Sequence, residues 1–271
     1  MKPALGCGVG VLLLLLAAAL AAFTPLYDGG LAIVIESRLL PPSAGHWLGT
    51  DPLGRDVLAL LAAGSRGSLL VALAAVAIGA GLGVPLGLAA AAAGGLGAEA
   101  LTRLNDLVFA FPALLLAVLV SATLGPGAAT AVLAIGIFNV PVFARLTQAS
   151  ARALASRDFV LAARAAGKGE LAIACEHLLP NLAGLLVVQV SMQLSLAIAA
   201  EAGLAYLGLG TQPPAPSWGR MLNEAQTLTA IAPWLAWFPG MALTLTVLAF
   251  GLIGEGLRAR LDPRERAPLG P

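Results

Sequence analysis

The chain has 271 residues, of which 59% are hydrophobic and only 11% charged, and its mean hydropathy is +0.92. Soluble domains carry roughly 25% charged residues, so these few charges cannot cover a globule of this size in water. The formal net charge of +1 also provides no basic field of the kind that attracts nucleic acid. The composition therefore excludes a soluble protein and predicts an all-α integral membrane protein in a lipid bilayer.

Six apolar runs have the length and composition of membrane-spanning helices, which need about 20 mostly apolar residues each. In chain order the predicted spans are Gly6–Phe23, Ser68–Ala93, Asp106–Leu124, Ala128–Phe143, Ala183–Ala202 and Trp234–Ile253. A cleaved secretory signal is an alternative interpretation of the first run, because Lys2 precedes it and Ala-x-Ala sequences lie inside it. We interpret it as a span, since that pattern is nearly unavoidable in an alanine-rich segment.

Six spans place both termini on one side of the membrane, and the cations then divide unequally between the two sides. Eleven of the fifteen Lys and Arg residues fall on the side of the termini and four on the other. The positive-inside rule makes the side of the termini cytoplasmic. The predicted organisation is an N-terminal transmembrane helix (1–24), an outward segment (25–67), a five-helix core (68–256) with a cytoplasmic loop (150–180), and a cytoplasmic tail (257–271).

The second predicted span carries Gly79, Gly83 and Gly87 at intervals of four residues. On a helix these positions form one stripe, along which another backbone can approach closely. The stripe indicates helix packing in a bundle, and we expect Gly81 and Pro85 to kink the same helix.

Polar side chains interrupt the predicted spans at a few positions. Gln189 and Gln193 lie four residues apart and share a helix face, which suits either the lining of a path for a polar solute or hydrogen bonds between helices. Glu201, near the outer end of the same span, belongs either to that path or at the headgroup level. Asn139 is isolated in span four, and Asp106 is expected to cap the helix of span three.

The sequence offers no motif for chemistry within this chain. Cys7 and Cys175 have no partner at metal-binding spacing, and His46 and His177 are predicted on opposite sides of the membrane. The Gly167-Lys-Gly sequence lacks the earlier Gly and the following Ser or Thr of a phosphate-binding loop. We therefore assign no catalytic residue, no metal and no cofactor to this chain, and any ATP that drives it must be bound by another polypeptide.

The cytoplasmic loop is predicted to form two short helices joined by a glycine elbow. Ser156 is expected to cap the first helix, which Gly167 ends, and Glu170–Leu179 to form the second, which Pro180 ends. Small side chains give the first helix a flat face, formed by Ala162, Ala163 and Ala166. Arg157 and Arg164, seven residues apart, lie near one side and are placed to pair with an acidic rim on a partner. From spacing alone, the loop is either a docking surface for a partner or an amphipathic segment at the lipid headgroups.

The outward segment contains the sequence His46-Trp-Leu-Gly-Thr-Asp-Pro-Leu-Gly-Arg-Asp56. The spacing of Asp51 and Arg55 allows a helical i, i+4 salt bridge. The segment is either a docking surface or gate for an external protein, or a structural turn that anchors the loop on the bundle.

These loops carry a family resemblance. The cytoplasmic loop resembles the coupling loop of ABC-importer permeases at Ala162, Ala163, Gly167, Leu179 and Pro180, and departs from it at Leu161, where Glu is usual. The outward sequence, together with Leu207–Gly210 and Gln212–Leu222, is similar to the "C"-type permeases of the dipeptide, oligopeptide and nickel branch. The resemblance covers nearly the whole chain.

The resemblance implies a MetI-like bundle in the bacterial inner membrane that transports peptides. It also implies a homologous second permease, two cytoplasmic ATPase subunits that bind ATP and Mg, and an extracytoplasmic solute-binding protein. The residues to which it assigns coupling are Asp158, Phe159, Leu161, Ala162, Ala163, Arg164, Gly167, Leu179 and Pro180. Those of the outward motif are Gly49, Asp51, Gly54, Arg55 and Asp56, and the candidates for the path are Gln189, Gln193 and Glu201. Alternatives are a permease for nickel or metal chelates, or an ion-coupled secondary carrier.

Overall fold

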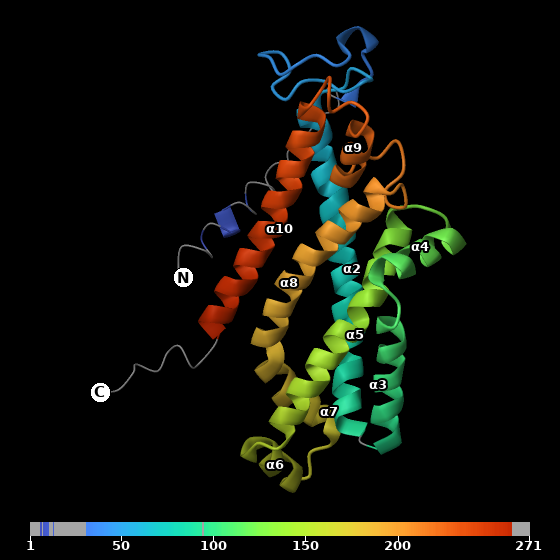
Figure 1. The fold of residues 1–271 in the computed structure, drawn as a ribbon. Helices are drawn as coiled ribbons and strands as arrows, with labels where there is room; N and C mark the ends of the chain where they lie inside the picture. Colours follow the sequence, from blue (N-terminus) through green and yellow to red (C-terminus); the bar gives the residue numbers. More distant parts are fainter. Residues whose placement is uncertain (1–5, 7, 11–12, 14–30, 94, 262–271) are drawn as a thin grey trace.

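The computed structural model describes residues 6, 8–10, 13, 31–93 and 95–261. In chain order its main elements are η2 (Ile35–Ser37), α2 (Val57–Ala93), α3 (Gly95–Phe109), α4 (Ala113–Leu124), α5 (Ala128–Ala155), α6 (Asp158–Ala165), α7 (Glu170–Ile173), the π-helical turn η3 (Ala174–Leu178), α8 (Leu179–Tyr206), α9 (Trp218–Ala225) and α10 (Trp234–Leu261). Figure 1 shows α2, α5, α8 and α10 as long rods. The segment before α2 lies over the upper ends of α2 and α10, and α6 and α7 lie by the lower ends of α5 and α8.

The prediction of an all-α membrane protein is confirmed for this part of the chain, where pairing of the strand type is limited to one isolated bridge between Thr50 and Asp56. Four helices are long and apolar enough to cross a membrane, and the bent pair α3 and α4 provides a fifth span if counted as one. Most of the predicted first span lies outside the described residues, as do Lys2, Cys7 and the last ten residues. The six-span count and the side of the termini therefore stay predictions.

The predicted glycine stripe is the contact between α2 and α5. A Cβ atom at Gly83 would lie 2.5 Å from the carbonyl oxygen of Val140 and 2.7 Å from Cβ of Phe143. One turn further on, a Cβ at Gly87 would lie 2.5 Å from the carbonyl oxygen of Ala144. Only glycine allows the two backbones to come this close, so the stripe fixes how α2 and α5 pack.

The predicted third span, Asp106–Leu124, is not one helix. α3 ends at Phe109 and α4 begins at Ala113, and the two helices are bent by 84°. Pro112 has no N–H group to continue the α3 hydrogen bonds, and its ring disfavours helical dihedrals at the preceding residue. An average over hydropathy does not detect this break, because apolar residues flank Pro112 on both sides.

Asp106 does not cap a helix, which corrects the prediction. It lies inside α3, where its carboxylate pairs with Arg145 of α5. The Arg145 guanidinium also stands over the ring of Phe109, 4.5 Å from the ring centre. The position of Asp106 changes because α3 begins at Gly95, three turns before the predicted start of the span.

Pro180 does not end a helix either. α7, η3 and α8 follow one another without a break, so Glu170–Tyr206 is a single helical rod of 37 residues. A proline inside an α-helix clashes with the carbonyl four residues earlier, which here belongs to Glu176. That residue lies in the π-helical turn, whose wider ring changes the hydrogen bonding just where the proline enters. The predicted span Ala183–Ala202 is therefore only the middle of this rod.

The α2–α5 seam predicts a sharp contrast between two glycines of the same helix. We expect Gly83→Leu to lower the free energy of unfolding by about 1–3 kcal/mol or more, because its side chain would overlap the α5 backbone. Gly81→Leu is the matched control, since a Cβ there meets nothing within 4 Å. The thermal unfolding midpoint of the purified protein measures both changes, and equal midpoints for the two variants would contradict the seam.

Candidate functional site

The outward motif folds around the carboxylate of Asp51, which is almost completely buried (3% exposed). One oxygen accepts hydrogen bonds from the backbone N–H groups of Leu53 and Arg55, each at 2.8 Å. The other oxygen accepts a hydrogen bond from Nε of the Arg55 guanidinium and pairs with its Nη2, both at 2.7 Å. The predicted pair between Asp51 and Arg55 is confirmed. Its predicted helical setting is wrong, because the residues form a turn ahead of α2.

Two glycines of the motif hold conformations that other residues rarely adopt. Gly49 and Gly54 have φ values of +79° and +75°. A Cβ at Gly49 would lie 2.7 Å from the carbonyl oxygen of Leu40, and one at Gly54 would overlap the carbonyl group of Val34. The glycines therefore let the outward segment fold back on itself in direct backbone contact.

Asp56 and Thr50 attach this folded segment to the helices. Asp56 caps α2, with Oδ1 accepting the N–H of Leu58 at 2.8 Å and Oδ2 accepting His46 Nδ1 at 2.9 Å. The carbonyl oxygen of Thr50 accepts the indole N–H of Trp234, at the start of α10, at 3.3 Å. The motif residues thus form a rigid outer cap, residues 31–56, joined to α2 and α10.

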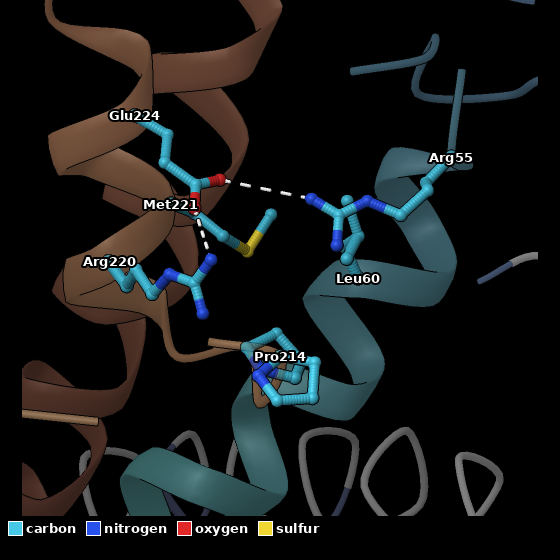
Figure 2. Close-up of a pocket in the computed structure, with 7 residues that line it drawn as sticks. Arg55, Leu60, Pro214, Arg220, Met221 and Glu224 are labelled. Atoms are coloured by element: carbon cyan, nitrogen blue, oxygen red, sulfur yellow. Dashed lines mark ion pairs between the residues drawn. The ribbon is translucent and has the colours of Figure 1, made fainter. Parts of the chain in front are cut away.

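The outer cap also reaches α9, where Arg55 meets two charged residues that the sequence analysis did not assign to a site, Arg220 and Glu224. Figure 2 shows Arg55 and Arg220 on either side of the carboxylate of Glu224. Glu224 lies 2.7 Å from Arg220 and 3.9 Å from Arg55. The small pocket between them is lined in part by Pro214 and Met221. The i, i+4 spacing of Arg220 and Glu224 was the available signal, but nothing in it indicates the cross-link to Arg55.

The three residues predicted to line the translocation path, Gln189, Gln193 and Glu201, do not lie together on one open surface. Gln193 is buried and donates its amide N–H to Asn139 Oδ1 at 2.5 Å, so it joins α8 to α5. Gln189 is half-buried. This use of Gln193 matches the second of the two interpretations, the hydrogen bond between helices.

Glu201 has a different environment. It is completely buried (0% exposed), so its carboxyl is open neither to headgroups nor to water. The sequence did not reveal this burial, because the segment between α8 and α10 looks like a surface loop, whereas Ser217 and Trp218 lie over this end of α8 and are buried themselves.

The cytoplasmic loop has the predicted glycine elbow. Gly167 follows α6 with a φ of +82°, and its N–H donates to the carbonyl of Arg164 at 2.9 Å. The N–H of Lys168 donates to the carbonyl of Ala163 at 3.1 Å. These two bonds form the Schellman motif that closes a helix C-terminus with a left-handed residue.

Ala163 does not share the exposed face of α6, which corrects the prediction. It is buried with Val160 against Ile173 and Leu178 of the following helix, while Ala162 and Ala166 are exposed. Val160 and Ala163 occupy one side of α6, so a partner can meet only the remaining exposed side chains, among them Phe159, Leu161, Ala162 and the C-cap residue Ala166. The sequence did not reveal which side of this short helix the loop itself would cover.

Ser156 does not cap α6 either. Its hydroxyl donates to the carbonyl of Ala153 in the last turn of α5, and Arg157 stands at the N-cap position without a side-chain bond. Asp158 does lie in the first turn, as expected. Helix α5 extends about three turns beyond the predicted span, which ends at Phe143, and this places Ser156 at its end and not at the beginning of α6.

Ion pairs span the elbow. Arg164 donates to Glu170 through Nε at 2.8 Å and Nη2 at 3.0 Å, and Lys168 pairs with Glu176. The hydrogen bonds to Glu170 raise the pKa of Arg164 further, so this guanidinium stays charged. Arg164 is thus engaged within its own loop, whereas the sequence suggested a pair with a partner. Glu170 is a residue that the sequence analysis missed.

Leu179 and Pro180 lie where this loop enters α8. They form the first residues of that helix, directly after the π-helical turn. The loop is therefore a continuation of a membrane-crossing rod and not a separate appendage.

Comparison with known proteins gives consistent similarities. Residues 83–267 match the family described as binding-protein-dependent transport system inner membrane component. The chain is 41% identical over 261 residues to the glutathione transport system permease protein GsiD of Pectobacterium atrosepticum, covering 96% of this chain and 87% of that protein. It is 43% identical over 254 residues to GsiD of Shigella flexneri serotype 5b, covering 94% and 84%.

Among solved structures, a chain of the inward-facing methionine ABC transporter MetNI aligns with a TM-score of 0.61 and 19% identity. The alignment covers 75% of this chain and 97% of that chain. At this identity the likeness concerns the fold, and it confirms the predicted MetI-like bundle.

The outer cap predicts unequal effects from two similar charge removals. We expect Asp51→Asn to destabilise the cap by about 3–5 kcal/mol, because it removes the nearer and more buried of the two carboxylates that neutralise Arg55. Glu99→Gln removes the partner of Arg103 from a pair that is more than half exposed, and should cost less than about 1 kcal/mol. Limited proteolysis within residues 31–56 measures the difference. Equal cleavage rates for the two variants would show that the Asp51 pair does not hold the cap.

Proposed function

The chain belongs to the family of inner membrane components of binding-protein-dependent transport systems, and we propose that it is the permease subunit of an ABC importer for peptides. It is a multi-pass protein of the bacterial inner membrane, as its family and its apolar helices require. Its relatives GsiD carry the name of a glutathione transport system, and glutathione is a peptide-like solute. That similarity supports a peptide as cargo over the alternative of a nickel chelate.

The observation that carries the proposal is the construction of the cytoplasmic loop. Its first helix, α6, has an exposed side at Phe159, Ala162 and Ala166, and its other side is packed onto the loop's own core. We propose that this exposed side seats in a cleft of a cytoplasmic ATPase subunit. Leu161, also exposed, replaces the usual Glu with an apolar contact.

The loop is suited to transmit movement because it has no free hinge. Gly167 is fixed by the Schellman bonds, and Glu170–Tyr206 continues from the loop through the membrane as one rod. When the ATPases close on ATP, a displacement of α6 reaches α8 without loss in a flexible linker. Two permeases that respond in this way exchange inward-open for outward-open arrangements.

The remaining parts of the assembly are proposals that fit this scheme. ATP and Mg bind to two partner ATPases and not to this chain, and a homologous permease forms the other half of the path. The outer cap, with Gly49 and Gly54 at its turns, provides a rigid surface where an extracytoplasmic solute-binding protein docks. Residues 1–24 form the N-terminal span, 25–67 the outward segment, 68–256 the core, and 257–271 the cytoplasmic tail.

The direct test is reconstitution of the assembled transporter in lipid vesicles with its binding protein. We expect labelled glutathione or a dipeptide to enter only with ATP, and to stimulate ATP hydrolysis where a nickel chelate does not. Stimulation by the chelate alone would reassign the cargo. Uptake by this chain without ATPases, driven by an ion gradient, would instead identify a secondary carrier and overturn the proposal.

The elbow predicts that one of two neighbouring glycines is sensitive to proline. Gly167→Pro should reduce peptide uptake by tenfold or more, because proline cannot adopt a φ of +82° and also removes the N–H bonded to Arg164. Gly169→Pro should be nearly silent, since the φ of Gly169 is −72°, close to the value that proline requires. Uptake and basal ATP hydrolysis are measured together in each assembled variant. Similar uptake in both would remove the elbow from coupling.

An alanine-to-glutamate substitution should have different effects on the exposed and the buried side of α6. Ala162→Glu lies on the exposed side, so we expect normal folding of this chain with loss of ATPase binding. Ala163→Glu places a charge among Val160 and Ile173, and we expect loss of the folded loop and of membrane expression. Co-purification of the ATPases and the thermal midpoint separate the two outcomes. ATPase binding that survives Ala162→Glu would exclude this side as the docking surface.

A further inference from the structure

Glu201 is an acid whose hydrogen-bonding capacity the bundle does not use. Its side chain is 0% exposed, and neither carboxyl oxygen has a hydrogen-bond partner among the described residues. Asp51, the other buried acid in this part of the chain, accepts hydrogen bonds on both oxygens. A buried polar group without partners is rare and calls for a physical explanation.

The carboxyl faces the place where α2 meets α8 and α9. Two hydroxyls lie close to it without meeting hydrogen-bond geometry, those of Ser68 of α2 and of Ser217, which caps α9, and both residues are completely buried. The Ser68 hydroxyl accepts the backbone N–H of Trp218, and the Ser217 hydroxyl accepts that of Arg220, each at 3.3 Å. Hydroxyl groups both donate and accept, so they suit a neutral carboxyl but cannot offset a full buried charge.

No cation is placed to neutralise an ionised Glu201 within the described residues. α8 carries no other charged residue. The charged residues on the facing elements are Arg66 of α2 and Arg220 and Glu224 of α9. Arg220 pairs with Glu224 and donates to the carbonyl of Ala215, and Arg66 is exposed. An unpaired buried charge costs several kcal/mol, so the carboxyl keeps its proton in this arrangement.

Glu201 lies between two interfaces, that of α9 with α8 and that of α2 with both. α9 is fixed to α8 by backbone contact, because a Cβ at Gly219 would overlap the carbonyl group of Ala202. α2 is attached to this α8–α9 unit by Trp218, whose indole N–H donates to the carbonyl of Leu61 at 3.0 Å and whose backbone N–H reaches Ser68. α2 also approaches the segment before α9 closely, since a Cβ at Gly67 would lie 2.9 Å from the carbonyl oxygen of Pro216. We call the boundary between α2 and the α8–α9 unit the outer seam. If it parts, water reaches Glu201 and the acid ionises.

We propose that Glu201 is a proton-binding site, and that its proton holds the outer seam closed. The closed seam binds one more proton than the open seam, so acid favours closure and rising pH favours opening. Where the buried acid is protonated and the hydrated acid is ionised, each pH unit weakens closure about tenfold. The proposal depends neither on the identity of the cargo nor on the ATPases.

The state of the acid is measured by infrared difference spectroscopy on the assembled transporter in lipid nanodiscs. We expect the carbonyl band of a protonated carboxylic acid at neutral pH, absent from Glu201→Gln and shifted in Glu201→Asp. The Asp variant keeps an acid, so it identifies the band even if the Gln variant assembles poorly. A carboxylate band in place of the acid band would overturn the proposal.

The effect on the seam is measured by hydrogen–deuterium exchange of residues 211–226. Wild type and Glu201→Gln are compared at each pH, so that the intrinsic pH dependence of exchange cancels. We expect the wild type to exchange increasingly faster than the variant as the pH rises, by about tenfold per unit in the responsive range. The matched control is Glu224→Gln, an exposed acid of α9 that pairs with Arg220, for which we expect no rise of the ratio with pH. A pH-independent ratio for Glu201→Gln would overturn the proposal, whether or not the protein transports peptides.

Discussion

The close backbone contact between α2 and α5 is the interaction on which the rest of the structure depends. Lipid supplies no hydrophobic force to drive helices together, so association in a membrane requires close van der Waals contact over small residues. The glycines Gly79, Gly83 and Gly87 provide it along three turns of α2. Because α2 extends from the outer cap to the start of α3, its position against α5 also sets where both ends of the bundle lie. The loop and the cap are then built on fixed supports.

The two ends of the bundle are stiffened in different ways. In the outer cap, the pair of Asp51 and Arg55 is largely buried and further bonded to the backbone, so its geometry is tightly determined. In the cytoplasmic loop, the pair of Arg164 and Glu170 is exposed, and exposed ion pairs contribute little to stability. The stiffness of the loop therefore comes mainly from the buried Val160 and the Schellman bonds. The exposed ion pairs of the loop add little to this stability.

Features determined by local chemistry could be predicted from the sequence, and features determined by packing could not. The elbow at Gly167, the glycine seam and the Asp51 pair each depend on residues close in sequence. The break at Pro112 and the continuity through Pro180 show the opposite case, since the same residue type ends one helix and is accommodated in another. A π-helical turn precedes Pro180, and it has no hydropathy signal. The burial of Glu201 likewise depends on Ser217, sixteen positions away and outside its helix.

The single rod Glu170–Tyr206 connects the cytoplasmic loop with the outer seam. Its first turn bears Glu170, which bonds the elbow, and its last turns bear Glu201. A displacement imposed on the loop by a partner therefore acts on the same helix whose outer end the proton holds. Coupling between two sites is reciprocal in free energy, so whatever parts the outer seam must also change how firmly the loop is held by its partner. A rod without an internal hinge makes this coupling a mechanical consequence of the fold, because the helix continues through the π-helical turn near its base without interruption.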